Sequence, residues 1–195
     1  MVLLDYLKWR NDVSLKASPF NDIDNVILSC LAYIDFGEFF ANYDDSYTLE
    51  EIFELFCKNH SLDEIRESKQ FTEQIALLLE EMVQADRFKG TKVVHYAEDL
   101  DKEKVKQFAA VTFILPDGSN YISFRGTDST IIGWKEDFLM TIMADTEGAK
   151  EAVKYINKVS KFLEGNLMVG GHSKGGNFAM FASAFCDNVV QERIS

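Results

Sequence analysis

Two kinds of apolar spacing run along this chain, and they divide it near residue 90. In the first part, apolar residues recur every three or four positions, which is the spacing of a helix with one buried face. Two stretches carry it most clearly, namely Leu49, Ile52, Phe53, Phe56 and Cys57 in one and Phe71, Ile75, Leu78, Leu79 and Met82 in the other. We therefore predict that residues 1–90 are α-helical, with a longer helix in the second stretch and with breaks at Ser18-Pro19 and at Tyr43–Ser46.

Beyond residue 92 the spacing changes to the period of a β-strand. Val111, Phe113 and Leu115 alternate with smaller or polar residues, and Ile122 and Phe124 repeat the alternation after the turn sequence at 116–119. Two alternating runs on either side of a turn predict a β-hairpin.

Helical spacing then returns, and it leads to a strand, a sharp turn and another helix. We expect helices at about 132–143 and 147–163, the second of which ends at Gly165-Asn166. Leu167–Gly170 is predicted to be a short apolar strand, and after a turn a buried helix is expected from Gly176 to Phe185.

The order of these elements gives the fold class. We predict an α/β protein with an α-helical N-terminal region over residues 1–90 and, over 91–195, an α/β core whose sheet is flanked by helices. Residues 187–193 resemble a short amphipathic helix that leads to Ile194, where a further core strand would begin. We therefore expect the core to be incomplete at its C-terminal end.

The charge balance narrows the classes of partner. The chain of 195 residues has 32 acidic and 20 basic side chains, a net charge of −12. Residues 1–90 hold 18 of the acidic and 8 of the basic side chains, which we interpret as an acidic, solvated surface. Binding to a nucleic-acid backbone needs clustered Lys and Arg, so nucleic acid is not an expected partner.

The cysteine pattern indicates a reducing compartment. Cys30, Cys57 and Cys186 are odd in number and lack the spacing of zinc ligands, so we expect buried, reduced thiols and a cytoplasmic location. The acidic residues also lack the glycine pattern of a calcium loop, and we expect no metal and no cofactor. Asp5 interrupts the short apolar stretch near residue 1 and no apolar run reaches about 18 residues, so we expect neither a signal peptide nor a membrane span.

The candidate catalytic residues lie in the turn after the predicted strand at 167–170. Gly171-x-Ser173-x-Gly175 between a strand and a helix is the pattern of a nucleophile elbow, in which glycines let strand and helix approach and the serine hydroxyl is presented. The first N–H groups of the helix favour an oxyanion beside Ser173, and the backbone N–H of Lys174 would be one donor. The alternative is a tight glycine turn with an idle serine.

Two upstream sequences add a family resemblance. Phe124–Asp128 (FRGTD) follows the end of the hairpin, and Gly133–Phe138 (GWKEDF) lies in the next predicted helix. With the GHSKGGN sequence at 171–177, these motifs resemble the class 3 lipase branch of the α/β-hydrolases, and most of all its bacterial Mbeg-like members. The resemblance covers roughly residues 105–195.

This resemblance implies a partial α/β-hydrolase fold and a set of roles. Ser173 would be the nucleophile, and Lys174 and Thr127 would each donate a backbone N–H to the oxyanion, with the Thr127 hydroxyl assisting. Arg125 would be structural, and Trp134 would either wall an acyl pocket or belong to the core. Residues 128–133 lie where such lipases carry a lid, but the segment is too short and polar to be an interfacial lid.

A serine nucleophile needs a base, and the sequence does not supply a convincing one. No histidine follows His172, whose side chain should point away from that of Ser173 and is expected to be structural. Using His60 or His95 would break the family's order of serine, acid, histidine. Lys174 is expected to point into solvent or along the helix. Of the acidic residues after Ser173, namely Asp187 and Glu192, the first is too close behind the helix to be a convincing triad member.

Two functions remain open at this point. The first is a serine hydrolase that acts on a small carboxylic ester or a lipid ester, with its acid and histidine beyond residue 195, so that this chain alone is nearly inactive. The second is a non-catalytic hydrolase-fold module that binds a partner, which we cannot name from the sequence. Aromatic residues of the first half, including Trp9, Phe20, Tyr33, Phe36, Phe39, Phe40 and Tyr43, would form core or a cover over the hydrolase half.

Overall fold

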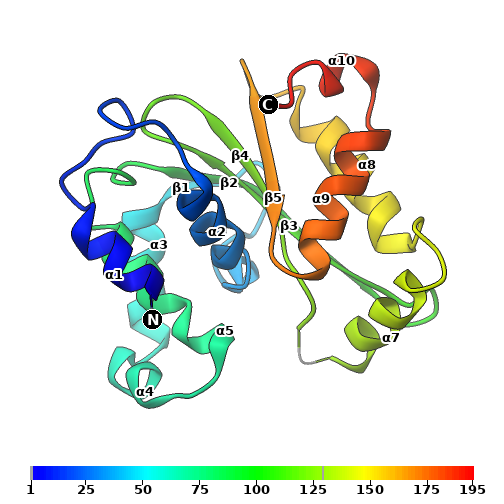
Figure 1. Cartoon of the computed structure of the whole chain (residues 1–195). Helices are drawn as coiled ribbons and strands as arrows, with labels where there is room; N and C mark the ends of the chain where they lie inside the picture. The colour runs from blue at the N-terminus through cyan, green and yellow to red at the C-terminus, as the bar shows by residue number, and fades with distance from the viewer. Residues whose placement is uncertain (1, 129) are drawn as a thin grey trace.

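The computed structural model describes residues 2–128 and 130–195, which form a mixed α/β fold around an open five-stranded sheet (Figure 1). The first half of the chain contributes α1 (Val2–Trp9), α2 (Asp22–Leu31), the short 3-10 helix η1 (Phe36–Glu38), β1 (Ser46–Thr48), α3 (Leu49–Asn59), α4 (Leu62–Glu67), α5 (Phe71–Gln74) and α6 (Ala76–Met82). The second half contributes β2 (Lys92–Asp101), β3 (Lys106–Ile114), β4 (Asn120–Phe124), α7 (Ile131–Met140), α8 (Glu147–Val159), β5 (Leu167–Gly171), α9 (Lys174–Phe185) and α10 (Asn188–Gln191).

The strands lie in the order of the sequence, β1-β2-β3-β4-β5. Each pair of neighbours from β1 to β4 is antiparallel. The predicted hairpin is confirmed as β3 and β4. β5 is parallel to β4, with Phe124 opposite Gly171, so both strands end at the same edge of the sheet. An isolated parallel bridge joins Ile194 to Leu167 on the free side of β5.

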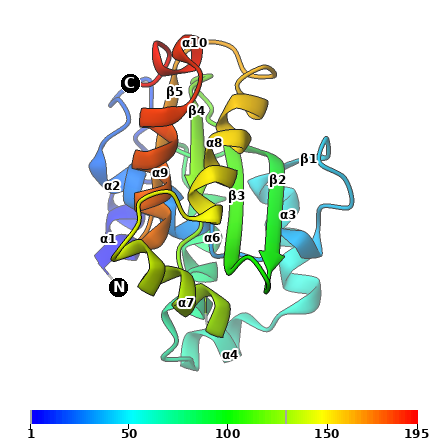
Figure 2. The same ribbon diagram turned by 90° about the vertical axis from the view of Figure 1, so that its right-hand side faces the viewer.

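Helices cover both faces of the sheet. Figures 1 and 2 show α1, α2 and α3 on one side and α8 and α9 on the other. Along β3, Ala109, Val111 and Phe113 belong to the core on the first side, whereas Phe108 and Ala110 belong to the core on the second. Strand residues point alternately to the two faces, so β3, which is buried from Lys106 to Phe113, carries apolar side chains in both directions.

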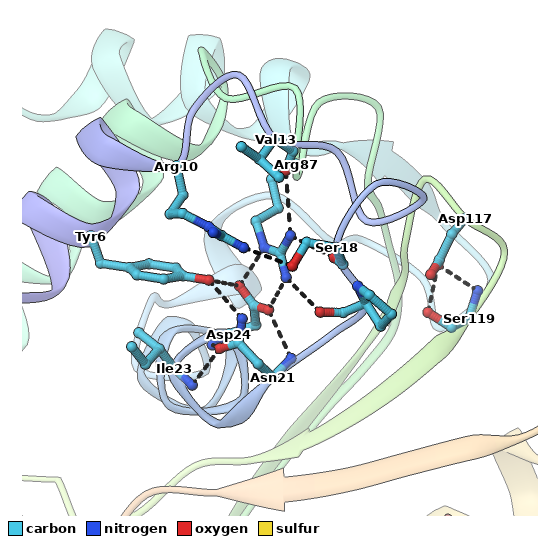
Figure 3. Close-up of polar contacts among 11 residues, drawn as sticks. Tyr6, Arg10, Val13, Ser18, Asn21, Ile23, Asp24, Arg87, Asp117 and Ser119 are labelled. Carbon is cyan, nitrogen blue, oxygen red and sulfur yellow. Dashed lines mark hydrogen bonds and ion pairs between the residues drawn. The ribbon is translucent and has the colours of Figure 1, made fainter.

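A buried ion pair holds the start of the chain to the rest of the first half (Figure 3). Arg87 donates through Nε to Asp24 of α2 at 2.7 Å, and its Nη2 also contacts that carboxylate. The same guanidinium donates to the backbone oxygens of Val13, Ser18 and Pro19 at 3.3, 2.9 and 3.0 Å. The long connection between α1 and α2 therefore has a fixed path that apolar spacing does not reveal.

The helical reading of residues 1–90 needs two corrections. The expected long helix at 71–82 is two short helices, because Leu78 N–H bonds to Ile75 O in a 3-10 turn. The backbone of Ile75 keeps helical dihedral angles, φ −62° and ψ −30°, so the interruption between the two helices is one of hydrogen bonding. The region also contains β1, which pairs with β2 and is too short at 3 residues to show a period.

Two further features differ from what the sequence predicts. β2 precedes the predicted hairpin and is not predicted as a strand of its own, and a bulge between Val94 and Ala97, where His95 has a positive φ of 55°, interrupts its alternation. Cys30 and Cys186 are buried as expected, but Cys57 is exposed, because it lies on the outer side of α3 and not on its apolar face. No helix in the described part of the chain is long and apolar enough to span a bilayer.

Candidate functional site

Ser173 lies in the turn that joins β5 to α9, at the edge of the sheet where β4 also ends. Its backbone has φ 57° and ψ −125°, a conformation that is costly for any residue except glycine. Its side chain is exposed. Strain held at an exposed serine, on a rigid strand and helix, is a feature that surrounding packing has to maintain.

The two flanking glycines allow this close packing because they have no side chain. A Cβ on Gly175 would lie 2.0 Å from the backbone oxygen of Phe124, and one on Gly171 would lie 2.4 Å from the backbone carbon of Gly175. Both distances are far inside van der Waals contact and involve backbone atoms that cannot move aside. The glycines are therefore needed because β4, β5 and α9 approach one another here, and not for a positive φ of their own.

At the beginning of α9, the backbone N–H of Lys174 differs from the two N–H groups that follow it. Gly175 N–H bonds to His172 O at 3.0 Å, and Gly176 N–H bonds to Ser173 O at 2.9 Å. The backbone N–H of Lys174 has no acceptor among the described residues. Unpaired N–H groups and the dipole at a helix start favour a negative charge at that place.

Thr127 belongs to the segment that leaves β4 and passes beside the Ser173 turn. A Cβ on Gly126 would lie 2.4 Å from His172 O, which shows how closely the two segments pack. The Thr127 hydroxyl donates to both oxygens of Asp137, at 2.8 and 2.7 Å. In this structure the proton of the Thr127 hydroxyl is directed at Asp137, so the hydroxyl would have to leave Asp137 before it could assist an oxyanion.

The side chain of Lys174 is buried, so the expectation that it points into solvent or along the helix is wrong. Its Nζ lies 3.0 Å from Glu136 Oε2 and donates to the backbone oxygen of Gln107, also at 3.0 Å. Both charged side chains are almost inaccessible, at 1% and 0% exposure. Burial lowers the pKa of the Lys174 ammonium, and the neighbouring Glu136 carboxylate opposes that change.

Glu136 has further hydrogen bonds that fix its position. Its Oε1 accepts from Gly148 N–H at 2.8 Å, and its Oε2 accepts from Gln107 N–H at 2.9 Å. The carboxylate therefore joins α7, α8, β3 and α9. Glu136 and Asp137 are adjacent in α7, and one holds the side chain of Lys174 while the other holds that of Thr127. Sequence spacing does not reveal this arrangement, because its partners are far apart in the chain.

Residues of the first half enclose the side chain of His172. The Tyr33 hydroxyl lies 3.1 Å from His172 Nδ1, and the rings of Tyr33 and Phe71 lie 5.7 and 5.3 Å from the imidazole. Burial raises the pKa of Tyr33 to about 12, so its hydroxyl is neutral. This environment agrees with the structural role expected for His172.

The remaining histidines have other partners. His60 Nε2 lies 2.9 Å from Glu38 Oε2, and its ring stacks on Phe56. The ring of His95 packs between Tyr43 and Phe162. Among the described residues, no histidine makes a hydrogen bond to the Ser173 hydroxyl.

Other candidate residues surround the turn less closely. Arg125 is buried and forms ion pairs with Glu98 and Asp128. Trp134 is 58% exposed, so the prediction that it belongs to the core is wrong. It also lines none of the pockets described below. The helix α7 meets the rest of the molecule through Gly133 and Glu136, which are buried, and this leaves Trp134 on the outer face. Asp187 Oδ1 accepts from Asn157 Nδ2 at 3.1 Å.

A groove of about 340 Å³ lies beside β5 and α9, and Val169, Gly171, Gly176 and Met180 are among the residues that line it. Ser173 is not one of its lining residues. A smaller pocket of about 220 Å³ lies near Tyr121 and Ser195. In the described chain, no three or more His, Cys, Asp or Glu side chains are grouped so that they could hold a metal ion.

The family of the chain follows from a comparison with family models. A model described as Mbeg1-like matches residues 82–195, which is more than half of the chain. The chain therefore belongs to the Mbeg1-like family, and the matched part contains Thr127, α7 and the Ser173 turn. Comparison with curated proteins found no match, and comparison with solved structures found none either.

Proposed function

We propose that this chain provides the nucleophile and the oxyanion-binding groups of a serine hydrolase that acts on carboxylic esters. The observation that carries the proposal is the Ser173 turn: an exposed serine at φ 57°, between a strand and the start of a helix, with no space for a Cβ at Gly171 or Gly175. This is the geometry that a nucleophile elbow requires, and here it lies at the edge of a mixed five-stranded sheet.

The proposed reaction begins when the Ser173 hydroxyl oxygen attacks the ester carbonyl carbon. The carbonyl oxygen becomes an oxyanion, for which the N–H of Lys174 and the N–H of Thr127 are the proposed donors. Collapse of the tetrahedral intermediate expels the alcohol and leaves an acyl group on Ser173, which water then removes. The exposure of Ser173 supports access by a small ester or by one chain of a lipid ester, and the groove of about 340 Å³ reaches Gly171, two residues before it.

The proton of Ser173 needs an acceptor that the described residues do not bring into contact with it. His172 is engaged by Tyr33, and the ammonium of Lys174 is buried against Glu136. The proposal therefore requires a general base from a group outside the described residues. For these 195 residues by themselves we expect little turnover.

A second candidate function is a non-catalytic module that keeps the turn and the groove but binds a partner. The observation that favours it is the same lack of a histidine hydrogen-bonded to Ser173 among the described residues. An elbow without a base keeps oxyanion binding and substrate binding but loses most of the rate.

Ester hydrolysis by the protein purified from the cells that make it separates the two candidates. Short-chain p-nitrophenyl esters would be assayed with the natural protein, with Ser173→Ala and with the matched control Ser46→Ala, which changes an exposed serine of β1 outside the described pockets. The hydrolase proposal predicts at least a thousandfold loss for Ser173→Ala, roughly the scale set by loss of a nucleophile, and full activity for Ser46→Ala. Activity retained in Ser173→Ala, or absent from the natural protein, would contradict it.

A further inference from the structure

Tyr33 of the helical first half lies between the two backbone segments that carry the proposed oxyanion donors. The helix α2 packs against β4 and β5, and Tyr33 follows this helix by two residues, near the edge of the sheet where both strands end (Figure 1). Its N–H donates to Cys30 O at 3.0 Å, which ties it to the end of α2. Tyr33 lies outside residues 82–195, the part of the chain that the family model matches.

The hydroxyl of Tyr33 contacts both segments. It lies 3.1 Å from Nδ1 of His172, which comes two residues before Lys174. On the other segment, a Cβ on Gly126 would lie 2.1 Å from the hydroxyl oxygen, so glycine at this position leaves the space that the hydroxyl occupies. Gly126 comes directly before Thr127. One side-chain oxygen therefore joins the segment of Thr127 to the segment of Lys174.

Aromatic neighbours hold the ring of Tyr33 on two sides. Phe71 and His172 pack edge-on against it, with ring centroids at 6.1 and 5.7 Å. Another side borders the largest described pocket of the first half, of about 490 Å³, which Tyr33 helps to line. Packing alone therefore leaves the ring room to shift, and the contact with His172 Nδ1 fixes the place of the hydroxyl.

We propose that Tyr33 is a positioning residue of the oxyanion site. Two N–H groups stabilise one oxyanion only when both lie within about 3 Å of the same oxygen. The Tyr33 hydroxyl sets the spacing between the segment of Thr127 and the segment of Lys174, and so keeps both N–H groups directed at one position. Tyr33 acts through these two segments and is not itself a catalytic residue. The inference rests on the proposed hydrolase function.

Tyr33→Phe tests this role, because it removes the hydroxyl and keeps the ring between Phe71 and His172. The matched control is Tyr6→Phe, which removes another tyrosine hydroxyl of the first half, bonded to Asp24 at 3.0 Å. Both variants would be made in the protein as its own cells produce it. Circular dichroism and urea unfolding would establish that each variant folds.

Three quantities would be measured for each variant. They are kcat and KM for short-chain p-nitrophenyl esters, and the inhibition constant of an alkyl trifluoromethyl ketone, which forms an oxyanion when the Ser173 hydroxyl adds to it. For Tyr33→Phe we expect at least a tenfold fall in kcat, at least a tenfold weaker inhibition by the ketone, and a KM within twofold of the natural value. The reason is that the spacing of the donors matters once the oxyanion has formed and not before. Tyr6→Phe should leave all three quantities within twofold.

The outcomes separate this inference from the proposed function. Lower stability of Tyr33→Phe without a fall in kcat would show a structural role, and a higher KM with an unchanged kcat would show a role in substrate binding. Either result, or an equal fall in kcat for Tyr6→Phe, would overturn the inference while the hydrolase proposal stands. Activity retained in Ser173→Ala, or absent from the natural protein, would overturn the hydrolase proposal and this inference with it.

Discussion

Replacing Glu136 by glutamine tests the network that ties the Ser173 turn to α7. The two oxygens of Glu136 accept three hydrogen bonds, from Gly148 N–H at 2.8 Å, from Gln107 N–H at 2.9 Å and from Lys174 at 3.0 Å. Glutamine has a single side-chain oxygen, so in either orientation its amino group faces one of these donors. The substitution also leaves the Lys174 ammonium buried without its opposite charge.

We expect Glu136→Gln to lower the free energy of unfolding by about 3–5 kcal/mol, the usual cost of removing one partner from a buried ion pair. Lys174→Met should cost an amount near the lower end of that range, because Glu136 keeps its two backbone N–H donors. The double variant should cost less than the sum of the two, with a coupling of at least about 1 kcal/mol, since the residues are in direct contact.

Urea unfolding followed by far-UV circular dichroism measures these changes. Tryptophan fluorescence would report less well, because Trp9 and Trp134 are 84% and 58% exposed. Lys150→Met is the control, since Lys150 pairs with Glu147 in solvent and its loss should hardly change the free energy of unfolding. A loss of less than about 1 kcal/mol of unfolding free energy in Glu136→Gln, or full additivity in the double variant, would show that the buried pair of Glu136 and Lys174 does not stabilise the fold.

Two further predictions concern other parts of the molecule. Gly175→Ala should lower the free energy of unfolding by more than about 4 kcal/mol or prevent folding, because its Cβ would lie 2.0 Å from Phe124 O. Gly176→Ala, whose Cβ would have its nearest contact at 3.0 Å, should lower it by about 1 kcal/mol. Similar unfolding midpoints for the two variants would contradict this prediction. Burial lowers the pKa of His95 in the folded protein, so the unfolded chain binds more protons just below pH 6.5 and stability should fall as the pH drops from 7.5 to 5. His95→Asn, which suits the positive φ of 55°, should lose part of this pH dependence, and an unchanged unfolding curve against pH would rule out His95 as its source.

The local elements of the second half were predictable because their signals are local. Leu167–Gly171, the Ser173 turn and α9 follow from an apolar run, closely spaced glycines and a further apolar stretch. Gly165, which was expected to end the preceding helix, has a positive φ of 75°. A three-residue strand such as β1 carries no such signal, since its pairing with β2 depends on residues more than forty positions away.

The contacts that fix the candidate site could not be predicted from the sequence. Lysine is rarely buried, so spacing alone places Lys174 in solvent. Its burial depends on Glu136 and Gln107, which are 38 and 67 positions away. The contact between Tyr33 and His172 spans 139 positions. These pairings appear only when the sheet brings the segments together.

If Ser173 is a nucleophile, a covalent probe of active serines should label it. The protein purified from the cells that make it would be treated with a fluorophosphonate probe, digested and mapped by mass spectrometry. We predict one adduct, on the peptide that contains Ser173, and no adduct in Ser173→Ala. An adduct on another residue, or ester hydrolysis without any adduct on Ser173, would contradict it.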